Sequence, residues 1–194
     1  VAWNMPNRLN FLCIVPMFHC NGWCYPWTVP MLNGKTICLR NIVVKKIFDL
    51  IEKNNVTHFG GAPIVLNMIT GAAESERKKL KNKVYVLTAG APPPSVIFKK
   101  MKNLGFEVMH VYGLTETYGH ITQCAWNDQW NNLDEEKQNE VKARQGVRYP
   151  NTEGVDVMDP ETMKPVPRDG KTMGEIMIRG NIVMKGYYKD KEAT

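Results

Sequence analysis

The sequence has few cysteines, and none stands in a paired arrangement. Only five occur among 194 residues, which is an odd number. Cys20 and Cys24 lack the spacing of a zinc ribbon or of a redox motif. We therefore interpret the cysteines as reduced thiols of an intracellular protein.

Long apolar runs and targeting segments are also missing. No apolar run approaches the ~20 residues of a membrane-spanning helix, and the longest, FLCIVPMF, is interrupted by Pro16. We find neither a signal peptide nor a C-terminal address, and no repeat or low-complexity tract. The chain starts on Val1 and stops at YYKDKEAT without a capping feature, so we expect it to be an internal piece of a longer protein.

Charge of one sign is not concentrated anywhere in the chain. The formal net charge is +6 and the isoelectric point is near 9.0, but the basic residues form only short clusters, ERKKLKNK and FKKMK. A mildly basic protein, or one that binds phosphate-rich small molecules, explains this balance, and we expect no nucleic acid partner. With 43% hydrophobic and 23% charged residues, the chain can form a globular core.

Apolar and helical segments alternate over the first 125 residues. Helix-like stretches at 23–32, 43–53, 63–73 and 94–104 separate short β-rich runs that end at glycine, proline or a charge. The runs are LNFLCIVP, KTICLR, VTHFGG, KVYVLTAG and FEVMHVYG. This alternation predicts an α/β fold in which helices flank a parallel sheet. Ligands bind beyond the carboxyl ends of such strands, where PMFHCNGW, GGAP, TAGAPPP and YGLTET fall.

The sequence becomes more polar after Cys124. We interpret residues 126–150 as a polar insertion and linker, with a solvated helix at 134–144 and an i,i+4 pair between Glu140 and Arg144. Residues 151–194 predict the start of a β-rich subdomain, with a hairpin across EGVDVMDPETMKPVPRDGKTMGEIMIRG. We expect GEIMIRG to be mainly structural, with Gly174 and Glu175 fixing the turn.

The stretch YGLTET allows two interpretations. In the first, a glycine turn follows a strand, the threonines cap a helix, and Glu116 lies in its first turn, where the helix dipole favours a carboxylate. In the second, free backbone N–H groups and a threonine hydroxyl hold phosphate oxygens, while the carboxylate holds Mg²⁺ shared with them. The other motifs make nucleotide chemistry the stronger interpretation.

Four separated motifs, in order, resemble the core motifs of the adenylate-forming superfamily. They are PMFHCNGW, TAGAPPP, HVYGLTET and GEIMIRGNIVMKGYY. Within that superfamily, MFHCNGW, LTAGAPPP, CAWNDQW and KARQGVRY are most similar to plant-type acyl-activating enzymes. The resemblance implies a ligase that uses ATP and Mg²⁺ to convert a fatty or aromatic carboxylic acid into an acyl-adenylate. The enzyme then transfers the acyl group to CoA.

The resemblance also implies roles for single residues. Glu116 would carry Mg²⁺, Thr115 would hydrogen-bond the α-phosphate, and Tyr112 would lie along the adenine. His19 would lie beside the carboxylate of the acid and orient it, although a lone histidine is more often a buried structural side chain. The implied nucleotide-binding set is Gly90, Ala91, Pro92, Tyr112, Gly113, Leu114 and Thr115, and the implied acyl pocket is His19, Trp23, Gly60, Gly61 and Val111.

Three further histidines receive a structural interpretation. They are His58, His110 and His120, of which His110 is close enough to Tyr112 to touch the pocket wall. The family's phosphate loop, its ribose-binding aspartate and its C-terminal catalytic lysine fall outside this sequence, so we expect residues 1–194 alone to be inactive. Two alternatives remain open: a non-catalytic nucleotide- or acyl-binding protein, and an adenylating enzyme with another acceptor. The resemblance implies a peroxisomal or cytoplasmic parent and leaves its oligomeric state open.

Overall fold

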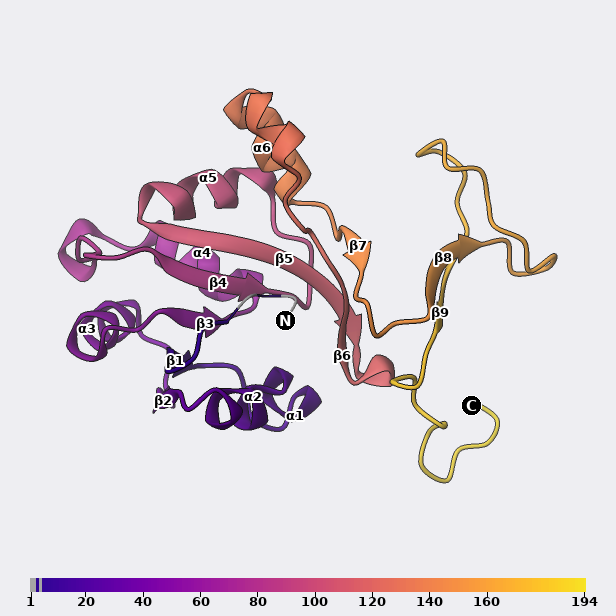
Figure 1. Ribbon diagram of the computed structural model, residues 1–194, viewed down its shortest axis with the longest axis horizontal. Coiled ribbons are helices and arrows are strands. Elements are labelled where there is room, and N and C mark those ends of the chain that lie inside the picture. Colours follow the sequence, from indigo (N-terminus) through magenta and orange to yellow (C-terminus); the bar gives the residue numbers. More distant parts are fainter. Residues whose placement is uncertain (1–2, 4) are drawn as a thin grey trace.

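The computed structural model describes residue 3 and residues 5–194 and contains one large sheet with helices on both faces (Figure 1). The sheet has seven strands in the order β2-β1-β3-β4-β5-β6-β7. Its strands are β1 (Asn10–Cys13), β2 (Lys35–Cys38), β3 (His58–Gly60), β4 (Val84–Thr88), β5 (Phe106–Leu114), β6 (Gly119–Gln123) and β7 (Val147–Arg148).

The first five strands are parallel, which confirms the predicted α/β class. Helices α3 (Val44–Asn54), α4 (Pro63–Gly71) and α5 (Ser95–Asn103) cover one face, and the short helices near β2 cover the other. Alternate residues of a strand serve the two faces: Leu12 of β1 packs into the first core, whereas Phe11 and Cys13 pack into the second. A strand that is buried on both faces has apolar residues at successive positions, so the sequence predicts it as a continuous apolar run.

One predicted helix, at 23–32, is wrong in its extent. The structure has two short helices there, α1 (Cys20–Trp23) and α2 (Tyr25–Met31), separated by Cys24 in the left-handed region at φ 64°. The helix α6 (Glu135–Lys142) lies within the predicted range 134–144. Its predicted Glu140–Arg144 pair is not formed, because the helix ends at Lys142 and Arg144 lies beyond it; Glu135 instead pairs with Lys99 of α5 at 3.0 Å.

The sheet is not parallel throughout. After β5 the chain makes a single 3-10 turn, η2 (Thr115–Thr117), and returns as the antiparallel strand β6, which pairs with β7. The predicted helix with Glu116 in its first turn is therefore absent. Glycine allows this tight reversal, since a Cβ on Gly113 would lie only 1.8 Å from the carbonyl oxygen of Gly119.

The remaining chain forms an antiparallel pair, β8 (Gly154–Met158) and β9 (Glu175–Arg179), set apart from the large sheet (Figure 1). The predicted hairpin is thus present, but Glu175 begins the second strand and pairs with Met158, and Gly174 directly precedes that strand, so the two residues do not fix the turn. The division into residues 1–125, 126–150 and 151–194 stays a prediction. Within the described residues, no helix combines the length and apolar character needed to cross a membrane.

Candidate functional site

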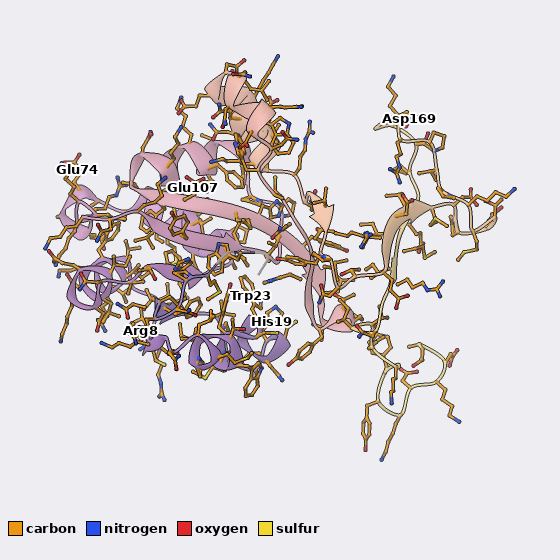
Figure 2. All side chains as sticks on the ribbon, viewed as in Figure 1. Arg8, His19, Trp23, Glu74, Glu107 and Asp169 are labelled. Atoms are coloured by element: carbon orange, nitrogen blue, oxygen red, sulfur yellow. The ribbon has the colours of Figure 1, made fainter. Side chains whose placement is uncertain are left out.

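The loops that carry the motifs lie at one edge of the sheet. Because β1, β3, β4 and β5 are parallel, the segments that follow them emerge at the same side, beyond the carboxyl ends of the strands. Figure 2 shows His19 and Trp23 at this end of the sheet.

The turn after β5 is held from inside and exposes its functional side chains. The buried Thr117 hydroxyl accepts the Leu114 N–H at 3.0 Å and donates to the Gly119 carbonyl at 2.9 Å. Thr115 lies on the exposed side of the same turn. The hydroxyl of Thr115 and the carboxylate of Glu116 are thereby presented by the turn between β5 and β6 rather than by a helix end.

Glu116 is held by a distant segment of the chain. The Tyr187 hydroxyl donates to its Oε1 atom at 2.7 Å, and the Met184 N–H donates to its carbonyl oxygen at 2.7 Å. The Tyr187 hydrogen bond lowers the pKa of the Glu116 carboxyl group, so the group is held ionised. From the sequence alone, the strand before this segment receives only a structural role, and Tyr187 receives none.

The α1 segment borders the same turn on another side. The Sγ atom of Cys20 lies 3.8 Å from the Thr115 hydroxyl oxygen, and the Asn21 side-chain amide donates to the Tyr118 hydroxyl at 3.3 Å. His19, at the start of this segment, is exposed. The structure thus brings the HCN segment to the predicted phosphate-binding threonine, and leaves the His19 imidazole open to solvent.

His120 is a residue of this region that the sequence analysis set aside as structural. Its ring lies edge-on to the Trp23 ring with centroids 5.0 Å apart. Burial, with a smaller contribution from nearby His19, lowers its pKa to about 4. Among the described residues its buried Nε2 atom has no hydrogen-bond partner, which is uncommon for a buried polar atom. Only its spacing of four residues from Glu116 could have suggested it.

Of the five predicted acyl-pocket residues, three lie together, while Gly61 faces the other core and His19 is exposed. Trp23 and Val111 are buried in the same core cluster. Gly60 provides the space for it: a Cβ there would come within 2.9 Å of the Tyr25 ring and 3.1 Å of the Trp23 ring. A Cβ on Gly61 would instead meet side chains of β3 and α4, on the first core. An open groove of about 540 Å³ adjoins this cluster, lined by Trp23, Cys24, Thr117, Tyr118, His120, Tyr149, Pro150, Asn151 and Ile182.

The predicted adenine-binding residues come from β5 and the loop after β4. Gly90 and Tyr112 each lie two residues beyond the last β4–β5 pair, Thr88 with His110. Gly90 has φ +94° and open space where a Cβ would stand, and both Ala91 and Pro92 are exposed, so a flat ring can approach this backbone. Tyr112 is half-buried and lines an open groove of about 650 Å³ toward β8.

The two remaining histidines are buried away from these loops. His58 stacks on Tyr85 with ring centroids 5.1 Å apart, and burial lowers its pKa to about 4. The His110 Nδ1 atom lies 2.8 Å from the Ala143 carbonyl oxygen, which directs the ring toward the end of α6. Burial lowers the pKa of His110 as well. Both imidazoles thus have structural neighbours.

The residues at the edge suit a magnesium ion shared with a nucleotide. The described part of the chain has no group of three or more histidine, cysteine or acidic side chains that could form a metal cage. Mg²⁺ is usually bound by one or two carboxylates together with substrate phosphates and water, and Glu116 offers one carboxylate beside the exposed Thr115 hydroxyl. Glu116 is the residue that would hold the ion, and Thr115 would contact a phosphate.

Comparisons with known proteins agree with this architecture. The sequence pattern of the family described as AMP-binding enzyme matches residues 1–188. The peroxisomal acetate/butyrate–CoA ligase AAE7 of Arabidopsis thaliana is 52% identical over all of this chain, which covers 34% of that protein. The peroxisomal benzoate–CoA ligase of the same plant is 44% identical, again over all of this chain and 33% of that protein. The chain therefore spans about a third of the length of these relatives.

A solved structure extends the comparison to the fold. The N-terminal domain of FACL13 from Mycobacterium tuberculosis superposes with a TM-score of 0.76 at 24% identity, over 98% of this chain and 45% of that one. At this identity the likeness concerns the fold, and it includes the arrangement of sheet and helices described above.

Proposed function

Because this chain belongs to the AMP-binding enzyme family, we propose that it is part of an ATP-dependent, AMP-forming acyl-CoA synthetase. The protein joins a carboxylic acid to the α-phosphate of ATP and releases pyrophosphate. The thiol of CoA then attacks the acyl carbon of the adenylate, which forms the thioester and releases AMP. The observation that carries this proposal is the exposed Thr115–Glu116 turn at the carboxyl edge of the sheet, with the His19–Cys20 segment beside it.

The first half-reaction needs charge stabilisation on the phosphates and an aligned nucleophile. Bound Mg²⁺ would neutralise phosphate charge, with Glu116 as its protein ligand. The Thr115 hydroxyl donates to an α-phosphate oxygen, and the His19 imidazole, exposed at the neighbouring segment, orients the carboxylate of the acid. These residues come from separate loops, so the fold and not the local sequence sets their spacing.

The adenine and the acyl group of the adenylate are assigned to different sets of residues at the carboxyl edge of the sheet. Tyr112 and the backbone of Gly90, Ala91 and Pro92 receive the adenine, because Gly90 leaves open space beside its backbone. Gly113 and Leu114 complete the strand end that carries Thr115. Trp23, Gly60 and Val111 are the proposed acyl-pocket residues, and of these Trp23 and Val111 share the second core cluster, whereas Gly61 faces the first core.

The names of the relatives favour a small or aromatic acid. One relative is an acetate/butyrate–CoA ligase and another a benzoate–CoA ligase, and both are named as peroxisomal. We propose a short-chain or aromatic acid as substrate, CoA as acceptor, and the peroxisome or the cytoplasm as the compartment. Two alternatives differ from this: a non-catalytic protein that binds nucleotide or acyl groups, and an adenylating enzyme that uses another acceptor.

Pyrophosphate release by the purified full-length protein tests the proposal. Acetate, butyrate and benzoate are supplied singly with ATP and Mg²⁺, first without and then with CoA, and the acyl-CoA is identified by mass. We expect pyrophosphate with at least one acid and its thioester once CoA is added. Pyrophosphate without a thioester would indicate another acceptor, and no pyrophosphate with any acid would favour a binding protein.

A further inference from the structure

The segment after β9 returns to the turn at the end of β5, although the two are far apart in the sequence (Figure 1). Its two contacts both reach the same residue. The Met184 N–H binds the backbone of Glu116, and the Tyr187 hydroxyl binds the Oε1 atom of its side chain at 2.7 Å. The backbone and the carboxylate of Glu116 are therefore fixed by one segment.

Tyr187 is itself held in place. Its N–H donates to the Thr194 hydroxyl oxygen at 2.9 Å, and that hydroxyl donates to the Asp190 carbonyl at 2.6 Å. Residues 187–194 thus form a closed loop, which ties the backbone of Tyr187 while its ring reaches Glu116. A donor on a tied backbone restricts the rotamers of its acceptor more than a free side chain would.

Resting on the function proposed above, we propose that Tyr187 is a positioning residue for the metal-binding carboxylate. Its hydroxyl occupies Oε1 of Glu116, and no side chain among the described residues donates to Oε2, where a divalent cation would bind. Hydrogen bonds to a ligating carboxylate orient the ligand, and their loss typically lowers metal affinity or activity by about 10- to 100-fold. A tyrosine hydroxyl donates without adding charge, so it orients Glu116 without competing as a cation.

The test uses the full-length protein with Tyr187→Phe, which removes the hydroxyl and keeps the ring. The control is Tyr188→Phe, because the neighbouring Tyr188 is 88% exposed and its ring contacts Lys189. We expect Tyr187→Phe to raise the Mg²⁺ concentration for half-maximal pyrophosphate release by about 10- to 100-fold. The rate of pyrophosphate release at saturating Mg²⁺ should change less. Tyr188→Phe should leave both values unchanged.

Metal binding is also measured without turnover. Mn²⁺ is titrated into the protein with a non-reacting ATP analogue, and free Mn²⁺ is followed by electron paramagnetic resonance. We expect weaker Mn²⁺ binding for Tyr187→Phe, and no added effect of Tyr187→Phe in a Glu116→Ala background. This readout applies even to a protein that proves unable to form acyl-CoA, so the failure of the proposed function and of this inference are distinguishable.

Two results would overturn the inference. Equal Mn²⁺ affinity of the wild type and Tyr187→Phe would show that the Tyr187–Glu116 hydrogen bond has only a structural role. Tighter Mn²⁺ binding by the variant would show that Tyr187 competes with the ion for Glu116. Melting temperatures of both tyrosine variants are measured alongside, and a loss of metal affinity at an unchanged melting temperature supports positioning over a general loss of structure.

Discussion

Gly113 is the position where the structure allows the sharpest test of how the site is built. The substitution Gly113→Ala adds one methyl group to β5, directly before the Leu114–Thr117 turn. The new Cβ would lie 1.8 Å from the Gly119 carbonyl oxygen and 2.7 Å from the Cα of His120. Both neighbours are backbone atoms, so no side-chain rotation can relieve the contact.

The size of the effect follows from that distance. Contacts of a Cβ below 3.0 Å essentially do not occur, so β6 would have to retreat by more than about 1 Å from β5. Overpacking alone costs about 1–3 kcal/mol, and the retreat also weakens backbone hydrogen bonds worth about 1 kcal/mol each. We expect a loss of about 3 kcal/mol or more in the free energy of unfolding. Thr115 and Glu116 follow after Leu114 in the same turn, so we expect the rate of adenylation to fall as well.

The assay compares urea unfolding and pyrophosphate release for the wild type and two variants. Gly71→Ala is the matched control, because a Cβ at the end of α4 would meet nothing within 4 Å. It should leave both measurements within error or stabilise the protein slightly. If Gly113→Ala unfolds within about 0.5 kcal/mol of the wild type, the close β5–β6 approach is not what holds the turn.

Three further predictions follow from the site and its surroundings. Glu116→Ala should lower pyrophosphate release by several powers of ten at an unchanged melting temperature, because the metal ligand is lost; a near-normal rate would contradict the metal role. Gly60→Ala should raise the KM for the acid about tenfold or more and leave the KM for ATP unchanged, because it displaces the Trp23 and Tyr25 rings. His58 and His120 take up protons near pH 6.5 in the unfolded protein, whereas burial holds their pKa values at about 4 in the folded protein. The urea concentration at the unfolding midpoint should therefore fall as the pH drops from 6.5 to 4. His58→Phe should make this dependence on pH weaker.

The sheet was predictable because its signals are local. A parallel strand buried on both faces must be apolar at successive positions, and β1 and β4 meet that requirement with LNFLCIVP and VYVLT. Proline at the start of α4 and before α5 marked two helix boundaries correctly. Each of these signals lies within the element that it predicts.

The errors occurred where contacts distant in sequence decide the backbone. Cys24 takes a left-handed conformation that breaks the predicted helix at 23–32, and the neighbouring Trp23 packs against Gly60 and His120 from other strands. No local pattern encodes such packing. The Tyr187–Glu116 hydrogen bond joins residues 71 positions apart, and it was missed for the same reason.

The geometry of the turn favours one of the two interpretations of Glu116 that the sequence allows, and the metal-binding role stays a proposal. A carboxylate in the first turn of an α-helix gains from aligned peptide dipoles and free N–H groups. Thr115–Thr117 is a single 3-10 turn that leads directly into β6, so there is no such dipole to account for an acidic residue here. The neighbour that stabilises the ionised carboxylate is a tyrosine hydroxyl on one oxygen. A carboxylate held by neutral donors, at the carboxyl edge of a parallel sheet, can take a cation as its further partner, and a magnesium-bound nucleotide requires such a ligand.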